Sequence, residues 1–540
     1  MVSSRRLPLP QQRRRPTSWT VLGCIFFAAC WSWQMLHHHA FVPGHQLYSS
    51  PTSGRTARRD TRNVGLRLHA TSPALDETSI STDSPTVPPL EESCDIVVAG
   101  GGIGGLTTAL RLLQLPWSRP TRILLVDAKD RYNFQPLMVD YAVSDVVELD
   151  DFAPTYSSLL EYALRERTPP PPFTYHATVD FLQANISSVE NGERQLEGQL
   201  PSGDTVVIRY ESMVLAPGLR QEFPVPGQTT SPIAQRFATL EDAEMLKARL
   251  STLNNTDKIV VVGGNYVGVE LAVSLAEEGW NVTLFAGSTL LGSSRPETRR
   301  QASDKLQELA VDVKLAYVNE VLSDGVRWQS TAAPASGSNS SEGAEGKLGC
   351  AAVLVSGAGR GPPEEFCFAP RGSAGPARLS VDRRLQAAPG VFCLGDAANS
   401  GAALTGQAAI AQAEIAAWNV YALQMELPSA VWRDFESSDA LGEFVALGRE
   451  EAAGAVNTWR LPAVVPSALP GLAAQAAAPF AELAASLGPE KELNVSGMPA
   501  AAIRRLAYLY RLPTLGHRLK VAARWARRLA DWQESQQGLA

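Results

Sequence analysis

A glycine-rich stretch near residue 100 constrains the fold more than any other part of the chain. The apolar run Ile96–Ala99 is too short for a helix, and it ends in Gly100-x-Gly102-x-x-Gly105, after which helical spacing begins. This order predicts a strand, a phosphate-binding loop and a helix whose N-terminus faces an anion. Gly100 permits the tight turn, Gly102 lets the backbone approach a pyrophosphate, and Gly105 lets helix and strand pack closely.

A carboxylate follows the first loop at the sequence spacing that is typical of a dinucleotide site. The apolar run Ile123–Val126 predicts a second strand, and it ends in Asp127, about 22 residues past Gly105. An acid at this place binds the ribose hydroxyls of a dinucleotide. Strand, loop, helix and acid together predict an α/β dinucleotide-binding unit, whereas glycines alone would also fit a simple turn.

A second loop of the same kind begins at Gly263. Its sequence, Gly263-Gly264-Asn265-Tyr-Val-Gly268, follows an apolar strand and precedes an apolar helix, but the middle glycine is replaced by Asn265. Asparagine tolerates left-handed backbone angles, so we expect the turn to survive. Its side chain is nevertheless expected to crowd a pyrophosphate, which leaves the strength of nucleotide binding here open.

The second unit lacks the ribose-binding acid. Its next strand, Val282–Phe285, ends in Ala286, and Arg295, Arg299 and Arg300 lie further on. Losing the carboxylate removes the repulsion of a 2′-phosphate, with which a nearby arginine can pair. We therefore expect NADPH to be at least as good a donor as NADH. The arginines fit a solvated helix face equally well.

Two such loops followed by Gly395-Asp396 resemble the two-dinucleotide-binding-domain flavoproteins. The resemblance implies an α/β fold with two Rossmann-like domains, one for FAD and one for NAD(P)H. It also implies that the segment at Gly395 returns the chain to the FAD domain, with Asp396 bound to the ribityl and phosphate end. Past the N-terminal region the cysteines are Cys94, Cys350, Cys367 and Cys393, without a Cys-x-x-Cys pair, which disfavours a disulfide reductase.

Several further stretches resemble the type II NAD(P)H:quinone oxidoreductases, most closely their plant and cyanobacterial plastid-type branch. These stretches are Phe134-Gln-Pro-Leu137, Phe237-Ala-Thr-Leu240-Glu-Asp-Ala243, Gly268-Val-Glu270-Leu-Ala272, Gly406-Gln407-Ala-Ala409, Trp418-Asn419, Leu441-Gly-Glu443, Leu447-Gly448-Arg449, Arg504-Arg-Leu-Ala-Tyr508-Leu-Tyr510-Arg511-Leu-Pro513 and His517-Arg518. The resemblance implies non-covalent FAD, hydride transfer from NAD(P)H, two-electron reduction of a membrane prenylquinone, and no proton pumping.

The motifs assign candidate site residues, none of them to a metal. The cofactor-binding candidates are Gly100, Gly102, Gly104, Gly105, Asp127, Pro136, Gly218, Gly263, Gly264, Gly268, Gly395 and Asp396. The catalytic candidates are Glu270, which the helix dipole alone would also favour in a first helical turn, and Gln407. Gln407 matches the first glutamine of a family motif, Ala-Gln-x-Ala-x-Gln. The second is replaced by Ala411, and Gln412 falls on another helix face.

The N-terminus has the composition of a targeting region. Arginines precede a short apolar run, Trp19–Trp33, and an acid-poor, arginine-rich segment follows. This order predicts a signal peptide and a transit peptide for a plastid of secondary origin. A signal-anchor with a stalk, a mitochondrial address and a secretory membrane are the alternatives. The predicted divisions are 1–40 signal peptide, 41–92 transit peptide and linker, 93–237 and 376–430 FAD domain, 238–375 NAD(P)H domain, and 431–540 C-terminal membrane-association region.

The C-terminus predicts peripheral contact with a membrane. Val521, Ala522, Trp525, Leu529 and Trp532 share one helix face, with basic residues elsewhere, as in an interfacial helix. A core helix or a homodimer helix would show the same pattern. The segment 329–347 is rich in Ser, Gly and Ala and predicts a disordered loop. The net charge of −7 gives no indication of a nucleic-acid partner.

Two other functions fit the same sequence. A sulfide:quinone-type flavoenzyme shares the predicted fold but needs cysteines beside the flavin. A catalytically weak membrane flavoprotein with a binding or sensing role is compatible with Asn265 and Ala411.

Overall fold

The structure is a computed structural model, and it describes most of the chain beyond residue 88. The signal and transit predictions, and the predicted linker as far as residue 88, therefore lie outside the described residues, as do Leu529 and Trp532. The last residues of the predicted linker, 90–92, belong instead to the strand Leu90–Ala99. The described residues are 89–144, 147–166, 176–221, 225–331, 345–357, 359–363, 366, 378–402, 404–436, 442–457, 492–514, 516–525 and 527.

The larger sheet has eight strands, and its main path is β18-β19-β6-β1-β2-β3. The five strands from β19 to β3 run parallel, because helices and other crossovers return the chain to the same end of the sheet. Its strands are β1 (Leu90–Ala99), β2 (Thr121–Asp127), β3 (Ala177–Gln183), β4 (Asn185–Glu190), β5 (Gln195–Gln199), β6 (Thr205–Leu215), β18 (Gln386–Ala388) and β19 (Val391–Cys393).

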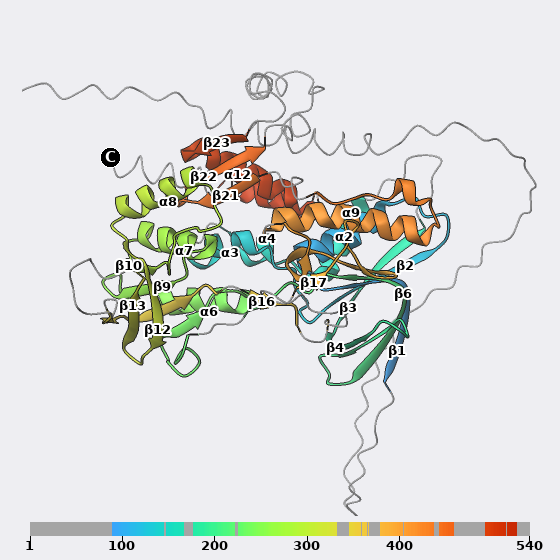
Figure 1. Ribbon diagram of the computed structural model, residues 1–540, viewed down its shortest axis with the longest axis horizontal. Coiled ribbons are helices and arrows are strands. Elements are labelled where there is room, and N and C mark those ends of the chain that lie inside the picture. Colours follow the sequence, from blue (N-terminus) through green and yellow to red (C-terminus); the bar gives the residue numbers. More distant parts are fainter. Residues whose placement is uncertain are drawn as a thin grey trace, which may run out of the picture.

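Two helices from distant parts of the chain pack together on this sheet. They are α2 (Ile103–Gln114) and α9 (Gly406–Gln424), and Figure 1 shows them side by side above the strands. Ile96–Ala99 of β1 are completely buried, as expected for a central parallel strand covered on both faces. The sheet therefore combines strands that precede the second nucleotide unit in the sequence with strands that follow it.

The second sheet is parallel throughout, in the order β11-β10-β9-β15-β8. Its strands are β8 (Ala234–Arg236), β9 (Lys258–Val262), β10 (Asn281–Phe285), β11 (Asp312–Lys314) and β15 (Ala352–Val355), and the accompanying helices are α6 (Leu240–Leu250), α7 (Tyr266–Glu277) and α8 (Pro296–Glu308). Together the two sheets confirm the predicted α/β architecture with two Rossmann-like units.

An antiparallel sheet adjoins the second unit. It consists of β12 (Ala316–Val321), β13 (Gly325–Ser330) and β14 (Glu345–Gly349). The predicted disordered loop at 329–347 was therefore wrong at both ends, because Gln329 and Glu345 pair with each other across β13 and β14. Residues 332–344 lie outside the described part.

Short elements complete the connections. They are β7 (Arg220–Gln221) with β16 (Gly359–Gly361), β17 (Leu379–Ser380) with β20 (Ala398–Asn399), the 3-10 helices η1 (Gln135–Leu137), η3 (Gly395–Ala397) and η4 (Ser429–Val431), and the helices α3 (Met138–Ala142), α4 (Leu149–Phe152) and α5 (Tyr156–Glu166).

The C-terminal region contains strands as well as a helix. An antiparallel sheet of β21 (Gly442–Ala446), β22 (Ala452–Asn457) and β23 (Glu492–Ser496) precedes α12 (Gly497–Arg511). The alanine-rich β22 has little intrinsic strand preference. It is a strand because its small residues fit under α12, where Ala452, Ala453 and Ala455 are fully buried.

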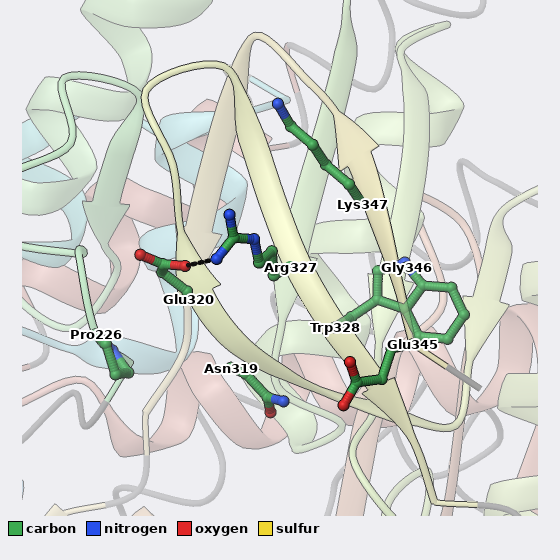
Figure 2. Close-up of a pocket in the computed structure, with 8 residues that line it drawn as sticks. All are labelled: Pro226, Asn319, Glu320, Arg327, Trp328, Glu345, Gly346 and Lys347. Atoms are coloured by element: carbon green, nitrogen blue, oxygen red, sulfur yellow. Dashed lines mark hydrogen bonds and ion pairs between the residues drawn. The ribbon is translucent and has the colours of Figure 1, made fainter. Parts of the chain in front are cut away.

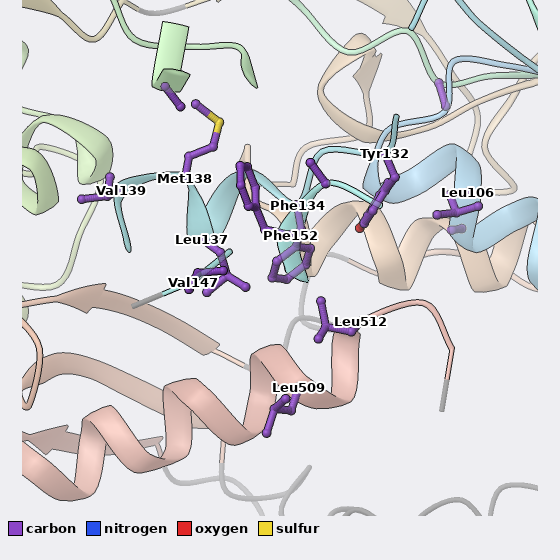
Figure 3. Close-up of a cluster of buried hydrophobic side chains, with 14 of the residues drawn as sticks. Leu106, Tyr132, Phe134, Leu137, Met138, Val139, Val147, Phe152, Leu509 and Leu512 are labelled. Atoms are coloured by element: carbon purple, nitrogen blue, oxygen red, sulfur yellow. The ribbon is translucent and has the colours of Figure 1, made fainter. Parts of the chain in front are cut away.

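Helix α12 packs on the loop that follows β2. Leu509 and Leu512 share one buried cluster with Leu137 and Phe152 (Figure 3). The rings of Phe134 and Tyr508 meet edge to face with centroids 5.6 Å apart. The loop after Asp127, which contains the cofactor-binding candidate Pro136, is thus partly covered by the protein's own C-terminal region.

The last described helical segment also faces the core. Val521 is fully buried and Trp525 nearly so. Arg524 pairs with Asp151 at 2.8 Å and with Glu148 at 2.5 Å. Two of the apolar residues assigned to a membrane-facing stripe are therefore used in packing. None of the described helices is both long and apolar enough to span a bilayer.

Candidate functional site

The first glycine loop is shaped by its own chain at two positions. Gly100 has φ +103°, and a Cβ there would lie 2.3 Å from the carbonyl oxygen of Ala216. A Cβ on Gly105 would lie 1.8 Å from the carbonyl oxygen of Gly100. At Gly104 a Cβ would instead meet the end of the flexible Leu394 side chain, at 2.3 Å. Gly100 and Gly105, which face backbone atoms, are needed for folding whether or not a ligand binds.

Gly102 is different, because no described atom lies within 4 Å of the place its Cβ would occupy. It has φ −60° and ψ −173°, which any residue adopts, and it precedes α2 without supplying a side-chain cap. The folded chain thus leaves open space in front of the N-terminus of a 12-residue helix. Such a cradle fits a pyrophosphate, which the helix N–H groups and dipole attract.

Asp127 is fixed beside this cradle. Its Oδ2 accepts a hydrogen bond from the Gly101 amide at 2.6 Å, and its Oδ1 accepts one from the Lys129 amide at 2.8 Å. Burial raises the pKa of the carboxyl group, against the lowering effect of these two hydrogen bonds. A carboxylate has further acceptor positions, so Asp127 retains the capacity to bind ribose hydroxyls.

The chain returns to the same sheet edge at Gly395. Leu215 of β6 pairs with Ala99 of β1 on one side and with Cys393 of β19 on the other, so the carboxyl ends of the three strands meet. Gly218 and Asp396 follow two of these strand ends by three residues each. Gly218 has φ +68°, and its Cβ position is open. Burial raises the pKa of the Asp396 carboxyl group, while Arg378 opposes the shift. Candidates far apart in sequence thus gather at one edge.

Gln412 holds this return segment, a role that sequence reasoning missed. It is almost fully buried, its Oε1 accepts the Gly395 amide at 2.6 Å, and its Nε2 donates to Ser400 Oγ at 2.8 Å. Gln407 Oε1 is buried with no hydrogen-bond partner in the described part of the chain. The displaced glutamine is therefore structural, and Gln407 keeps an unsatisfied acceptor.

The second loop repeats the first in its backbone. Gly263 N donates to Phe285 O at 2.9 Å, just as Gly100 N donates to Val126 O at 2.8 Å. Ala286 is therefore the structural counterpart of Asp127. Gly263 has φ +130°, and a Cβ on Gly268 would lie 1.9 Å from Gly263 O.

Ala286 also packs against the loop. A Cβ on Gly264 would approach the Ala286 Cβ to 2.9 Å, and only 5% of Ala286 is exposed. The carboxylate of the first unit is thus replaced by a small apolar contact.

The backbone of Asn265 does not adopt the left-handed angles considered in the sequence analysis. Its φ of −83° and ψ of 179° match the extended conformation of Gly102, so the turn does not require left-handed angles at this position. The side chain caps α7, because Oδ1 accepts the Gly268 amide at 2.9 Å and Nδ2 donates to Ser356 O at 3.1 Å. The amide side chain thus lies at the helix N-terminus, where a pyrophosphate is expected.

Two of the arginines beyond Ala286 contact nearby parts of their own chain segment. Arg300 pairs within α8 with Glu297 at 2.6 Å and with Asp304 at 3.2 Å. Arg299 donates to the carbonyl oxygens of Gly292 and Ser294. These contacts do not assign either arginine to a 2′-phosphate.

Glu270 lies in a buried polar cluster rather than in the open loop. Its Oε1 accepts the Ala446 amide at 2.8 Å and lies 3.6 Å from Arg504 Nη2. The same Arg504 nitrogen donates to Pro136 O at 3.3 Å. Burial raises the pKa of Glu270, and Arg504 opposes this. Arg504, which the sequence did not assign a role, thus connects two candidates.

Of the three described thiols, Cys393 is fully buried and the other two are unsuited to redox relay. Cys94 and Cys350 are free, and burial raises the pKa of Cys94 to about 12 and that of Cys350 to about 11. Since the thiolate is the reactive form, neither is an activated nucleophile. Cys367 lies outside the described residues.

A separate open cavity of about 500 Å³ lies on the sheet of β12, β13 and β14 (Figure 2). Arg327 and Glu320 pair across it at 2.9 Å, and Trp328 lies beside Gly346. None of its lining residues is a predicted site residue, so this cavity is distinct from the two nucleotide loops.

Comparison with known proteins agrees with this geometry. Residues 94–418 match the profile of the family described as pyridine nucleotide-disulphide oxidoreductase. The chain is 29% identical to demethylphylloquinone reductase NdbB of Synechocystis sp. over 82% of this chain and 98% of that protein. It is 28% identical to alternative NAD(P)H-ubiquinone oxidoreductase C1, chloroplastic/mitochondrial, of Arabidopsis thaliana, with 80% of each chain covered.

The solved structure of NDH2 from Plasmodium falciparum in complex with NADH has a related fold. The TM-score is 0.59 at 14% identity, and the match covers 80% of this chain and 97% of that one. Because the family profile spans more than half of the sequence and both glycine loops, this chain belongs to the pyridine nucleotide-disulphide oxidoreductase family.

Proposed function

We propose that this protein is an FAD-dependent, non-proton-pumping NAD(P)H:quinone oxidoreductase. One observation carries the proposal: a single chain builds two strand–loop–helix units, and the first leaves an open cradle at Gly102. The relatives from Synechocystis sp. and Arabidopsis thaliana are both named as quinone reductases, and they match most of this chain. The similarity confirms the resemblance to the type II enzymes.

The first unit binds FAD and the second binds NAD(P)H. FAD, when bound, would supply the redox chemistry, namely hydride acceptance and two-electron reduction of a quinone. The protein binds and orients: the α2 N-terminus and Gly102 accommodate the pyrophosphate, Asp127 accepts from the ribose, and Asp396 lies at the return segment. The hydride step requires no acid or base from the chain, and Glu270 and Gln407 remain the catalytic candidates.

An anaerobic titration tests the proposal directly. Purified full-length protein should carry one FAD per chain, and NADPH or NADH should bleach its absorbance. Adding a soluble prenylquinone analogue should restore the absorbance stoichiometrically. Bleaching without reoxidation by quinone would contradict the quinone reductase assignment and favour a binding or sensing role.

The domain division, compartment and membrane contact are part of the same proposal. We assign 93–233 and 376–430 to the FAD domain, 234–375 to the NAD(P)H domain and 431–540 to membrane association. The first boundary lies before the sequence-based one at 237/238, because β8 (Ala234–Arg236) pairs with β15 of the second sheet. The relatives are a cyanobacterial enzyme and one named chloroplastic/mitochondrial, which supports a plastid membrane surface. A homodimer is compatible with this assignment.

Val521 and Trp525 are excluded from the membrane contact because they are buried. Lys520 and Arg527 are exposed on the same helical segment, and they remain available to anionic lipid headgroups. Reversing both charges with Lys520→Glu and Arg527→Glu should reduce sedimentation with anionic vesicles at low salt. The exposed pair Arg300→Glu and Lys347→Glu provides a control with the same change of net charge.

A further inference from the structure

An exposed aromatic ring lies against the residue that follows Ala286. Gly287 N donates to Ala316 O at 3.2 Å, which brings the end of β10 beside the start of β12. Tyr317 is the next residue, and its Cε1 lies 3.1 Å from the place of a Cβ on Gly287. The ring therefore rests on the Gly287 backbone, and no side chain can lie between them.

This ring is close to the expected position of a nucleotide ribose. The matched register makes Ala286 the counterpart of Asp127, the residue assigned to ribose binding in the first unit. Gly287 is one residue further, and the loop it begins is tied to the second phosphate loop through Leu291 N and Gly264 O, 2.6 Å apart. Tyr317 thus lies where the adenosine half of a dinucleotide leaves the phosphate loop.

Tyr317 is unusually accessible for an aromatic side chain. Its exposed fraction is 55%, and Leu315 on the same edge is 51% exposed. The ring can therefore receive a flat partner without rearrangement of the core. Adenine offers such a partner, because every base presents a π-face that stacks on an aromatic ring.

We propose that Tyr317 is a nucleotide-binding residue and forms the wall against which the adenosine half of NAD(P)H packs. The inference rests on the proposed function, in which the second loop binds the nicotinamide nucleotide. Stacking does not involve the 2′ position, so Tyr317 serves NADH and NADPH equally. Discrimination between the two belongs to Ala286, where no carboxylate repels a 2′-phosphate.

Calorimetric titration of the FAD-loaded full chain tests this without any turnover. The ligands are adenosine 2′,5′-bisphosphate and 5′-AMP, which carry the adenosine half alone. Tyr317→Ala should weaken both about tenfold or more, the range typical of lost base stacking. Tyr317→Phe should bind as the wild type does, and the exposed neighbour Leu315→Ala is the matched control.

Unchanged affinity in Tyr317→Ala, or an equal loss in Leu315→Ala, would overturn the inference. FAD content and melting temperature should match the wild type in all three variants, because the ring is outside the core. A wild-type chain that binds both ligands but fails to reduce quinones would overturn the proposed function and leave Tyr317 in place. A wild-type chain that binds neither ligand would overturn both.

Discussion

Arg504 of α12 and Glu270 of α7 meet inside the protein, with 3.6 Å between Nη2 and Oε1. Both residues are less than 10% exposed. Arg504 also lies 3.8 Å from Asp140 of α3, and its guanidinium stacks on the Tyr508 ring. One cation therefore connects the nicotinamide unit, the loop after β2 and the C-terminal region.

Removing this cation should destabilise the protein strongly. Arg504→Met leaves the Glu270 carboxylate buried without its cationic partner, a change that typically costs about 3–5 kcal/mol. The double variant Arg504→Met/Glu270→Gln should recover part of this loss, because it removes the orphaned charge. Urea unfolding followed by flavin fluorescence measures each variant, with exposed Arg300→Met as the control. Equal loss from Arg300→Met would show that the buried position is not the cause.

Gly102→Val should abolish FAD binding while the apoprotein remains folded. The Cβ position of Gly102 is empty of protein atoms, so valine conflicts only with a ligand in the cradle. Gly192→Val is a matched control, because its Cβ position is equally open but lies in the hairpin between β4 and β5. The measurement is flavin absorbance per chain after purification. A Gly102→Val protein that retains the full flavin absorbance would refute the proposed pyrophosphate site at Gly102.

Ala286→Asp should shift donor preference toward NADH. The matched register places the new carboxylate where Asp127 lies in the first unit. There it should accept from the ribose 2′-hydroxyl, a charged hydrogen bond of about 1.5–3 kcal/mol, and repel a 2′-phosphate. The ratio of kcat/KM for NADH to that for NADPH should rise at least tenfold, whereas Ala286→Ser should leave it almost unchanged. A tenfold NADH preference in the wild type would show that another residue already holds the ribose.

Stability should fall in acid because of His517. The imidazole is buried, Nε2 lies 2.6 Å from Asp151 O, and Nδ1 has no hydrogen-bond partner among the described residues. Burial lowers the pKa of His517 from 6.5 to about 4. Below pH 6.5 the unfolded chain takes up a proton that the folded chain does not, so stability is full above pH 6.5 and falls toward pH 4.

Between pH 7.5 and 4.5, His517 should lower the free energy of unfolding by on the order of 2 kcal/mol. His517→Gln should remove it, while His176→Asn, at an exposed histidine, should not. Unfolding free energies of the three proteins at both pH values provide the comparison. A wild type and His517→Gln variant that lose the same stability in acid would exclude His517 as the cause.

Local sequence determined both nucleotide units. Their strands, loops and helices follow from short apolar runs, from glycines that alone tolerate the close approach at Gly105 and Gly268, and from Asp127 at the strand end. These signals are contained in about 30 consecutive residues each, so no distant contact is needed to read them.

Only the tertiary structure decided what the distant residues do. Gln412 holds Gly395, Arg504 contacts Glu270, and Tyr317 lies on Gly287, and each pair joins elements that the sequence alone does not place together. The Val521 and Trp525 face shows the same limit, since an apolar stripe has the same spacing whether it meets a bilayer or a protein core. Its burial here depends on the Arg524–Asp151 pair and on packing, which are properties of the folded chain.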